Sequence, residues 1–244
     1  MNPEAYLEMA QVEGEHWWFR GRRAIIESLI KKMRLPSSAR LMEVGCGTGG
    51  NLRLLSRFGE VSAFDMNETA CAFARTQCPA ATIRQGHCPD NIPYSKDDRF
   101  DLICLLDVLE HLTNDAAALI ALHSRLAPLG RILLTVPAYP MLWSTHDEIL
   151  HHHRRYRIKQ LQRLLTDAGF RIERLSHFNT LLFPLAALSR IPARLFNASV
   201  AGTTVPVKML NAALYKIFAA ERTLLSLMDL PYGVSLVAVV RPRY

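Results

Sequence analysis

Short apolar runs recur along the 244-residue chain with the spacing of alternating strands and helices. The clearest run is 100–106 (FDLICLL), and a nearly continuous apolar segment of this length is typical of a parallel strand buried on both faces. Similar runs predict six further strands, at 41–44, 61–65, 81–84, 129–137, 170–177 and 235–241. Strands that alternate with helical segments predict an α/β fold with a doubly wound sheet.

Helical spacing of apolar residues predicts helices at 22–33, 51–58, 114–127, 158–168 and 210–228. In the last of these, Glu221 occupies one place on an otherwise apolar stripe. An unpaired carboxylate there is costly, so we expect Glu221 to pair with an arginine or to face a pocket. The aromatic residues ahead of the first helix either form a lid over a ligand or pack that helix onto the sheet; they are Tyr6, His16, Trp17, Trp18 and Phe19.

A glycine-rich turn, 43–50 (EVGCGTGG), follows the first predicted strand. A strand, a glycine turn and a helix start can press backbone N–H groups against a nucleotide-like ligand. The dinucleotide pattern G-x-G-x-x-G is only half met, because the glycines fall at Gly45, Gly47, Gly49 and Gly50. The turn alone therefore predicts a ligand without naming it.

The order of residues in this turn resembles the first motif, E-x-G-C-G-x-G, of class I S-adenosylmethionine (SAM)-dependent methyltransferases. The resemblance covers about 40–174 and the last strand, and it implies a Rossmann-like sheet of seven strands whose last strand is antiparallel. It also implies that SAM is the cofactor and that the turn contributes to its site through Glu43, Gly45, Cys46, Gly47 and Gly49.

Further cofactor residues follow from strand ends and from the same resemblance. Asp65 ends the second strand, where a carboxylate can accept both ribose hydroxyls, and Met66 then packs on the adenine. Many family members have an Asp after the glycine at 86; this chain has His87, so Cys88 and the neighbouring backbone are expected to serve the adenine instead. Asp107 ends the central strand, and Arg22 is the guanidinium expected to meet the SAM carboxylate.

Two histidines are the predicted catalytic residues. His111 closes the segment 107–111 (DVLEH), which resembles a family motif at the end of the central strand, and it is the candidate base for a hydroxyl or an acidic carbon. His152 belongs to 152–156 (HHRRY), a run that resembles the substrate mouth of a subgroup of the family. A structural role for His111, bonding backbone at a helix start, is equally open.

A metal site is an alternative interpretation of the same segment. Asp107, Glu110 and His111 resemble the E-x-x-E-H ligands of some metal-dependent methyltransferases, with His146 or one of the histidines at 151–153 to complete the set. The same D-x-x-E-H wording is common in members without a metal, so the sequence predicts no metal.

The predicted strands and helices divide the chain into four parts. These are a lid and first helix (1–36), the SAM-binding core (37–177), a helical insertion (178–233) and the last strand (234–244). The insertion contains apolar segments at 181–188 and 193–200 that are broken by prolines and arginines, and none of its uncharged runs reaches the ~18 residues of a spanning helix. It could cap the substrate, rest on a membrane surface or form a homodimer interface.

Charge and cysteine content indicate which partner and which cellular location to expect. Residues 1–150 carry 15 Lys and Arg against 18 Asp and Glu, whereas 151–244 carry 14 against 4. The basic excess suggests an anionic partner or is simply a solvated surface. The N-terminus lacks the apolar core of a signal peptide, and five cysteines without a C-x-x-C pair fit neither a disulfide framework nor a zinc site, so a cytoplasmic location, at most peripheral to the inner membrane surface, is expected.

The leading prediction is thus a SAM-dependent methyltransferase that acts on a small or lipid-like acceptor, one that can carry an anionic head. An RNA methyltransferase is an alternative, but the insertion is too apolar for a groove that tracks phosphates, so nucleic acid is not the expected partner. A SAM-binding scaffold without activity is a third, and the persistence of Glu43, Asp65 and Asp107 argues against a decayed site.

Overall fold

A computed structural model describes residues 10–184 and 205–243, apart from the side chain of His146. Seven strands form one sheet in the order β3-β2-β1-β4-β5-β7-β6. All neighbours are parallel except β7, which is antiparallel to both β5 and β6. The strands are β1 (Arg40–Val44), β2 (Glu60–Asp65), β3 (Thr82–Gln85), β4 (Phe100–Leu106), β5 (Leu126–Pro137), β6 (Phe170–Phe178) and β7 (Ser235–Pro242). The predicted α/β sheet with an antiparallel last strand is confirmed.

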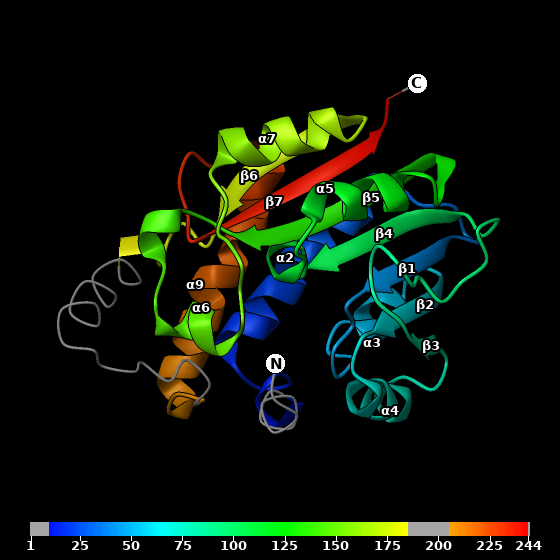
Figure 1. Ribbon diagram of the computed structural model, residues 1–244. Helices are drawn as coiled ribbons and strands as arrows, with labels where there is room; N and C mark the ends of the chain where they lie inside the picture. The colour runs from blue at the N-terminus through cyan, green and yellow to red at the C-terminus, as the bar shows by residue number, and fades with distance from the viewer. Residues whose placement is uncertain (1–9, 185–204, 244) are drawn as a thin grey trace.

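Helices cover both faces of the sheet (Figure 1). On one face, α2 (Trp17–Met33), α4 (Glu68–Gln77) and α9 (Lys208–Leu227) share a core with alternate residues of the central strands. On the other face, α5 (Asp115–His123) and α7 (Ile158–Asp167) pack against the residues in between. The shorter helices are α3 (Leu52–Leu55), η1 (Leu109–His111), η2 (Pro140–Leu142) and α6 (Thr145–Ile149).

The first helix begins five residues earlier than its apolar spacing predicts. It starts at Trp17, because the His16 side chain accepts the Trp18 N–H at the N-cap and the Asn211 side chain accepts the Trp17 N–H. Trp17 also packs edge to face on Phe218 of α9. The consecutive aromatics therefore lie within the helix, where contacts from a distant segment outweigh their poor local pattern.

Helices α2 and α9 run side by side in Figure 1 although almost two hundred residues separate their first turns. Gly21 permits this approach, since a Cβ at that position would stand 2.4 Å from the Phe218 ring. The predicted helix is confirmed, but its predicted apolar stripe is wrong in part, because Leu210, Ile217 and Met228 are exposed while Phe218 and Leu225 are buried beside Glu221. The expected arginine partner of Glu221 is also wrong for the described residues. The Glu221 carboxylate instead accepts the backbone N–H groups of Thr180 and Leu181, at 2.7 and 2.8 Å.

The described residues include only part of the predicted insertion (178–233). The apolar segment 193–200 and half of 181–188 lie outside the described residues. Among the helices that are described, none is both long and apolar enough to cross a membrane.

Candidate active site

The glycine turn lies where the strand order reverses, between β1 and its neighbours β2 and β4. The N–H groups of Gly45 and Cys46 donate to the Phe64 carbonyl, at 2.8 and 3.0 Å, and the Gly49 N–H donates to the Cys46 carbonyl. The Gly45 and Cys46 amides hold the loop against β2, the Gly49 amide closes a turn within the loop, and none of the three is free to bind a ligand. The expectation of N–H groups aimed at the ligand is therefore wrong for these three amides.

Asp65 lies at the mouth of the loop. Its Oδ2 accepts the Gly47 N–H at 2.9 Å and its Oδ1 accepts the Asn67 N–H at 3.0 Å. Burial raises the pKa of Asp65, and these amides lower it in part. A carboxylate has further lone pairs beyond these two bonds, so Asp65 can still accept hydroxyl groups.

Two of the predicted cofactor residues lie behind the loop rather than in the pocket. Glu43 is 1% exposed and accepts the Asn51 side-chain amide at 2.8 Å, and burial raises the pKa of Glu43 to about 8. Gly49 has φ +92, and a Cβ there would meet Ala74 of α4 at 3.1 Å. Both residues support the loop from beneath, and neither lines the cavity.

Arg22 and Asp107 form an ion pair across the pocket. The other Asp107 oxygen accepts the Thr135 hydroxyl at 3.1 Å, and Asp107 has φ +60. A non-glycine residue in this region is uncommon and often marks a functional position. Arg22 Nε is buried and has no hydrogen-bond partner within the described part of the chain.

Met66 and Cys88 also line the cavity. Met66 is 71% exposed, whereas Cys88 is buried. Burial raises the pKa of Cys88 to about 12, so its thiol is neutral. His87, which replaces the family's Asp, also lines the cavity.

One cavity of about 620 Å³ connects these residues to the predicted catalytic histidines. A volume of this order suits a nucleoside cofactor together with a small second molecule. The N-terminal segment closes one side, because the Glu13 carboxylate accepts the Thr48 hydroxyl at 3.0 Å and Arg23 donates to the Glu13 carbonyl. No signal in the sequence marked Glu13 as a pocket residue.

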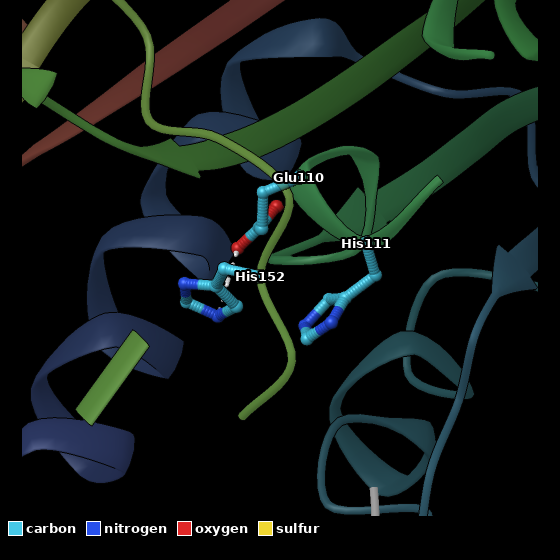
Figure 2. Close-up of side chains that lie close together, drawn as sticks. All are labelled: Glu110, His111 and His152. Carbon is cyan, nitrogen blue, oxygen red and sulfur yellow. Dashed lines mark ion pairs between the residues drawn. The ribbon is translucent and has the colours of Figure 1, made fainter. Parts of the chain in front are cut away.

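The rings of His111 and His152 lie edge to face with centroids 4.6 Å apart. Burial, with His152 adding to it, lowers the pKa of His111 to about 4, so its ring is neutral at pH 7. Figure 2 shows the Glu110 carboxyl pointing toward His152, with the His111 ring beside them. Burial, with the charge on Asp107 adding to it, raises the pKa of Glu110 well above its usual range.

A buried ion pair orients His152. Arg155 donates to both Asp147 oxygens, at 2.7 and 2.9 Å, and His152 Nδ1 lies 2.9 Å from Asp147 Oδ1. Although burial alone would raise it, the hydrogen bonds from His152 and Arg155 hold the pKa of Asp147 well below its usual range. An ionised carboxylate can only accept, so His152 Nδ1 carries a proton and directs Nε2 away from the ion pair.

The rest of the predicted substrate-mouth run has mainly a structural role. Tyr156 is fully buried, and its hydroxyl donates to Asp115 at 2.8 Å. Arg154 forms an ion pair with the same Asp115 and donates to the Thr113 carbonyl. Of the five residues, His152 and Arg155 reach the cavity.

A family model described as "Methyltransferase domain" matches residues 17–175, well over half of the chain. The chain therefore belongs to this family and is a class I SAM-dependent methyltransferase domain. The family implies that SAM is its cofactor.

Named relatives match over shorter stretches. The chain is 30% identical over 118 residues to dTDP-3-amino-3,6-dideoxy-alpha-D-glucopyranose N,N-dimethyltransferase of Streptomyces fradiae, which is 46% of this chain and 45% of that protein. It is 28% identical over 100 residues to ubiquinone biosynthesis O-methyltransferase of Alkalilimnicola ehrlichii, which is 39% of this chain and 40% of that one. Both alignments thus span less than half the length of these relatives.

A solved structure supports the fold over the whole chain. The plantazolicin methyltransferase BpumL, in complex with a pentazolic desmethylPZN analogue and SAH, aligns with a TM-score of 0.64 at 15% identity and covers 100% of this chain and 92% of that one. At this identity the likeness concerns the fold alone.

Proposed function

We propose that this protein transfers the methyl group of SAM to an oxygen or nitrogen atom of a small amphiphilic acceptor. The observation that carries the proposal is the single cavity that joins the glycine loop and Asp65 to His111 and His152. Such a cavity can hold the cofactor and the acceptor in line, and alignment supplies most of the rate enhancement in a methyl transfer.

The cofactor end has a donor or acceptor for each part of SAM. Asp65 would accept the ribose hydroxyls, Met66 and Cys88 would border the adenine, and Arg22 would donate to the carboxylate. The cavity position of these four residues supports the assignment. SAM supplies an electrophilic methyl group, whose bond to sulfur breaks as the bond to the acceptor forms.

The acceptor end combines two imidazole rings with apolar walls. Leu150, Leu182, Leu214 and Val234 line it from four separate segments, which suits an acceptor with an apolar portion. His111 and His152 are the groups placed to take the proton that the acceptor oxygen or nitrogen loses. The similarity to an amino-sugar and a ubiquinone-pathway methyltransferase supports a small molecule that presents an amine or a hydroxyl.

The test is incubation of a cell extract with methyl-labelled SAM, followed by mass spectrometry of small molecules, lipids and RNA. Wild-type protein should label a small or lipid-like compound, and Asp65→Asn should weaken SAM binding in calorimetry and reduce that labelling. Label confined to RNA, or no SAM binding at millimolar concentration, would contradict the proposal.

A further inference from the structure

Glu110 places a buried carboxyl group at the acceptor end of the cavity. Its side chain is 0% exposed, and neither carboxylate oxygen has a hydrogen-bond partner within the described residues. Buried carboxylates are normally hydrogen-bonded, paired or bound to a metal, because leaving water without compensation is costly. A buried group without a partner therefore calls for a specific explanation.

The neighbouring charges do not supply that partner. Arg22 is paired with Asp107, and Arg155 is paired with Asp147. The nearest basic atom is His152 Nε2, 3.9 Å from Glu110 Oε1, which is too far for a hydrogen bond. After these two pairs are formed, Glu110 is left as the carboxyl group of this cluster that has no hydrogen-bond partner among the described residues.

The two histidines complete a group of possible metal ligands. One ligand atom from each of Glu110, His111 and His152 lies within 4.8 Å of the other two. Donor atoms bound to one ion at about 2.0–2.2 Å stand roughly 3–4 Å apart, so the Glu110–His152 separation already fits and the widest pair needs an adjustment of about 1 Å.

The supports around the histidines are those that metal ligands commonly have. Asp147 accepts the His152 Nδ1 proton and thereby directs Nε2 away from the ion pair with Arg155. The His153 backbone N–H donates to the Glu110 carbonyl at 2.9 Å, which ties η1 to the histidine loop (residues 151–156). Two imidazoles and a carboxylate favour a transition-metal ion over Mg²⁺.

We propose that Glu110, His111 and His152 bind one divalent transition-metal ion, whose open coordination positions face the cavity and take an oxygen atom of the acceptor. Three protein ligands leave such positions vacant, and all three residues line the cavity. This differs from the ligand set considered from the sequence, because Asp107 is occupied by Arg22 and Thr135. The ion binding rests on the geometry alone, whereas the role of its open positions rests on the proposed function.

Cobalt provides a probe that does not depend on turnover, because its visible spectrum reports coordination. Protein stripped with a chelator is titrated with Co²⁺, and wild type should bind one ion per chain with a visible band. Glu110→Gln and His111→Gln should each weaken Co²⁺ binding by at least about tenfold. The matched control is His153→Gln, an exposed histidine of the same loop that is outside the cluster, and it should bind as wild type does.

Circular dichroism of each variant shows that it is folded before its titration is interpreted, and the two ligand variants serve as alternatives should one fail to fold. Equal Co²⁺ binding by wild type and a folded Glu110→Gln or His111→Gln variant, or no Co²⁺ binding by wild type below millimolar concentration, would overturn the metal site. Acetohydroxamate, a small bidentate oxygen ligand, should shift the Co²⁺ spectrum; an unchanged spectrum would overturn the open positions. SAM binding is measured separately on the protein after treatment with the chelator. Loss of Co²⁺ binding with SAM binding intact contradicts the metal site alone, whereas loss of SAM binding contradicts the proposed function.

Discussion

The two ends of the cavity are built in different ways. At the cofactor end, the glycine loop and Asp65 come from consecutive strand ends within about 25 residues, and their hydrogen bonds are mostly between backbone groups of β1 and β2. At the acceptor end, η1 and the histidine loop lie about 40 residues apart and meet through buried charged side chains. A local motif encodes the first end, whereas the second exists only after the chain has folded.

The two ends also differ in the hydrogen bonding of a buried carboxyl group. Glu43 lies behind the glycine loop, where Asn51 donates to one of its oxygens. Glu110 lies at the cavity, where neither oxygen has a partner among the described residues, and two imidazoles stand nearby. The first arrangement suits a neutral acid that supports a loop, and the second suits a group that awaits a ligand.

The largest effect that separates the two ends is expected from Arg155→Met. This change leaves the fully buried Asp147 carboxylate without its guanidinium, and breaking a buried pair in this way costs about 3–5 kcal/mol. Urea unfolding at pH 7 measures the loss, and SAM titration of the folded fraction should show an intact cofactor end.

Arg154→Met is the matched control for that change. Arg154 forms a partly exposed pair with Asp115, and such pairs contribute less than about 1 kcal/mol. Equal losses in the two variants would show that burial of the Arg155 pair is not what holds the histidine loop.

At the cofactor end, Glu43 is expected to make the free energy of unfolding depend on pH. Glu43 has a pKa of about 8 in the folded protein against 4.5 for an ordinary glutamate, so between these values the unfolded chain loses a proton that the folded protein retains. The free energy of unfolding should therefore fall by about 3 kcal/mol between pH 5 and 8 from this residue. Glu43→Gln, which resembles the neutral acid, should remove most of that slope.

Denaturant unfolding of wild type and Glu43→Gln at pH 5 and pH 8 measures the difference. Glu60→Gln, at an exposed position at the start of β2, is the matched variant and should keep the wild-type slope. Parallel slopes for wild type and Glu43→Gln would mean that Glu43 is ionised in the folded protein.

These differences explain which features could be predicted from the sequence. Strand runs predicted the sheet, and the wording of 43–50 predicted the cofactor, because both depend on neighbouring residues. The helical start at Trp17 and the backbone partners of Glu221 depend on contacts across the fold, with Asn211 and Thr180, which no local pattern contains. The convergence of Glu110 with His152 is of the same kind, since it needs the histidine loop to return over η1.

The smallest effect on folding, but a clear effect on binding, is expected at Gly47. Its φ of +52 disfavours a side chain by about 1 kcal/mol, and a Cβ there meets no protein atom within 4 Å because the position faces the cavity. Gly47→Ala should therefore lower the free energy of unfolding only slightly and weaken SAM binding by about tenfold, which equals about 1.4 kcal/mol. At Gly45, in contrast, a Cβ would stand 2.8 Å from Val108, so Gly45→Ala should impair folding as well.

Gly14→Ala is the control for Gly47→Ala, since a Cβ at Gly14 also meets nothing within 4 Å but its backbone lies outside the left-handed region and it does not line the cavity. Calorimetric titration with SAM and denaturant unfolding of the three variants separate backbone strain from occupied cavity space. If Gly47→Ala bound SAM as well as Gly14→Ala does, the cofactor would not approach the glycine loop closely, and the contrast between a locally encoded cofactor end and an assembled acceptor end would lose its first half.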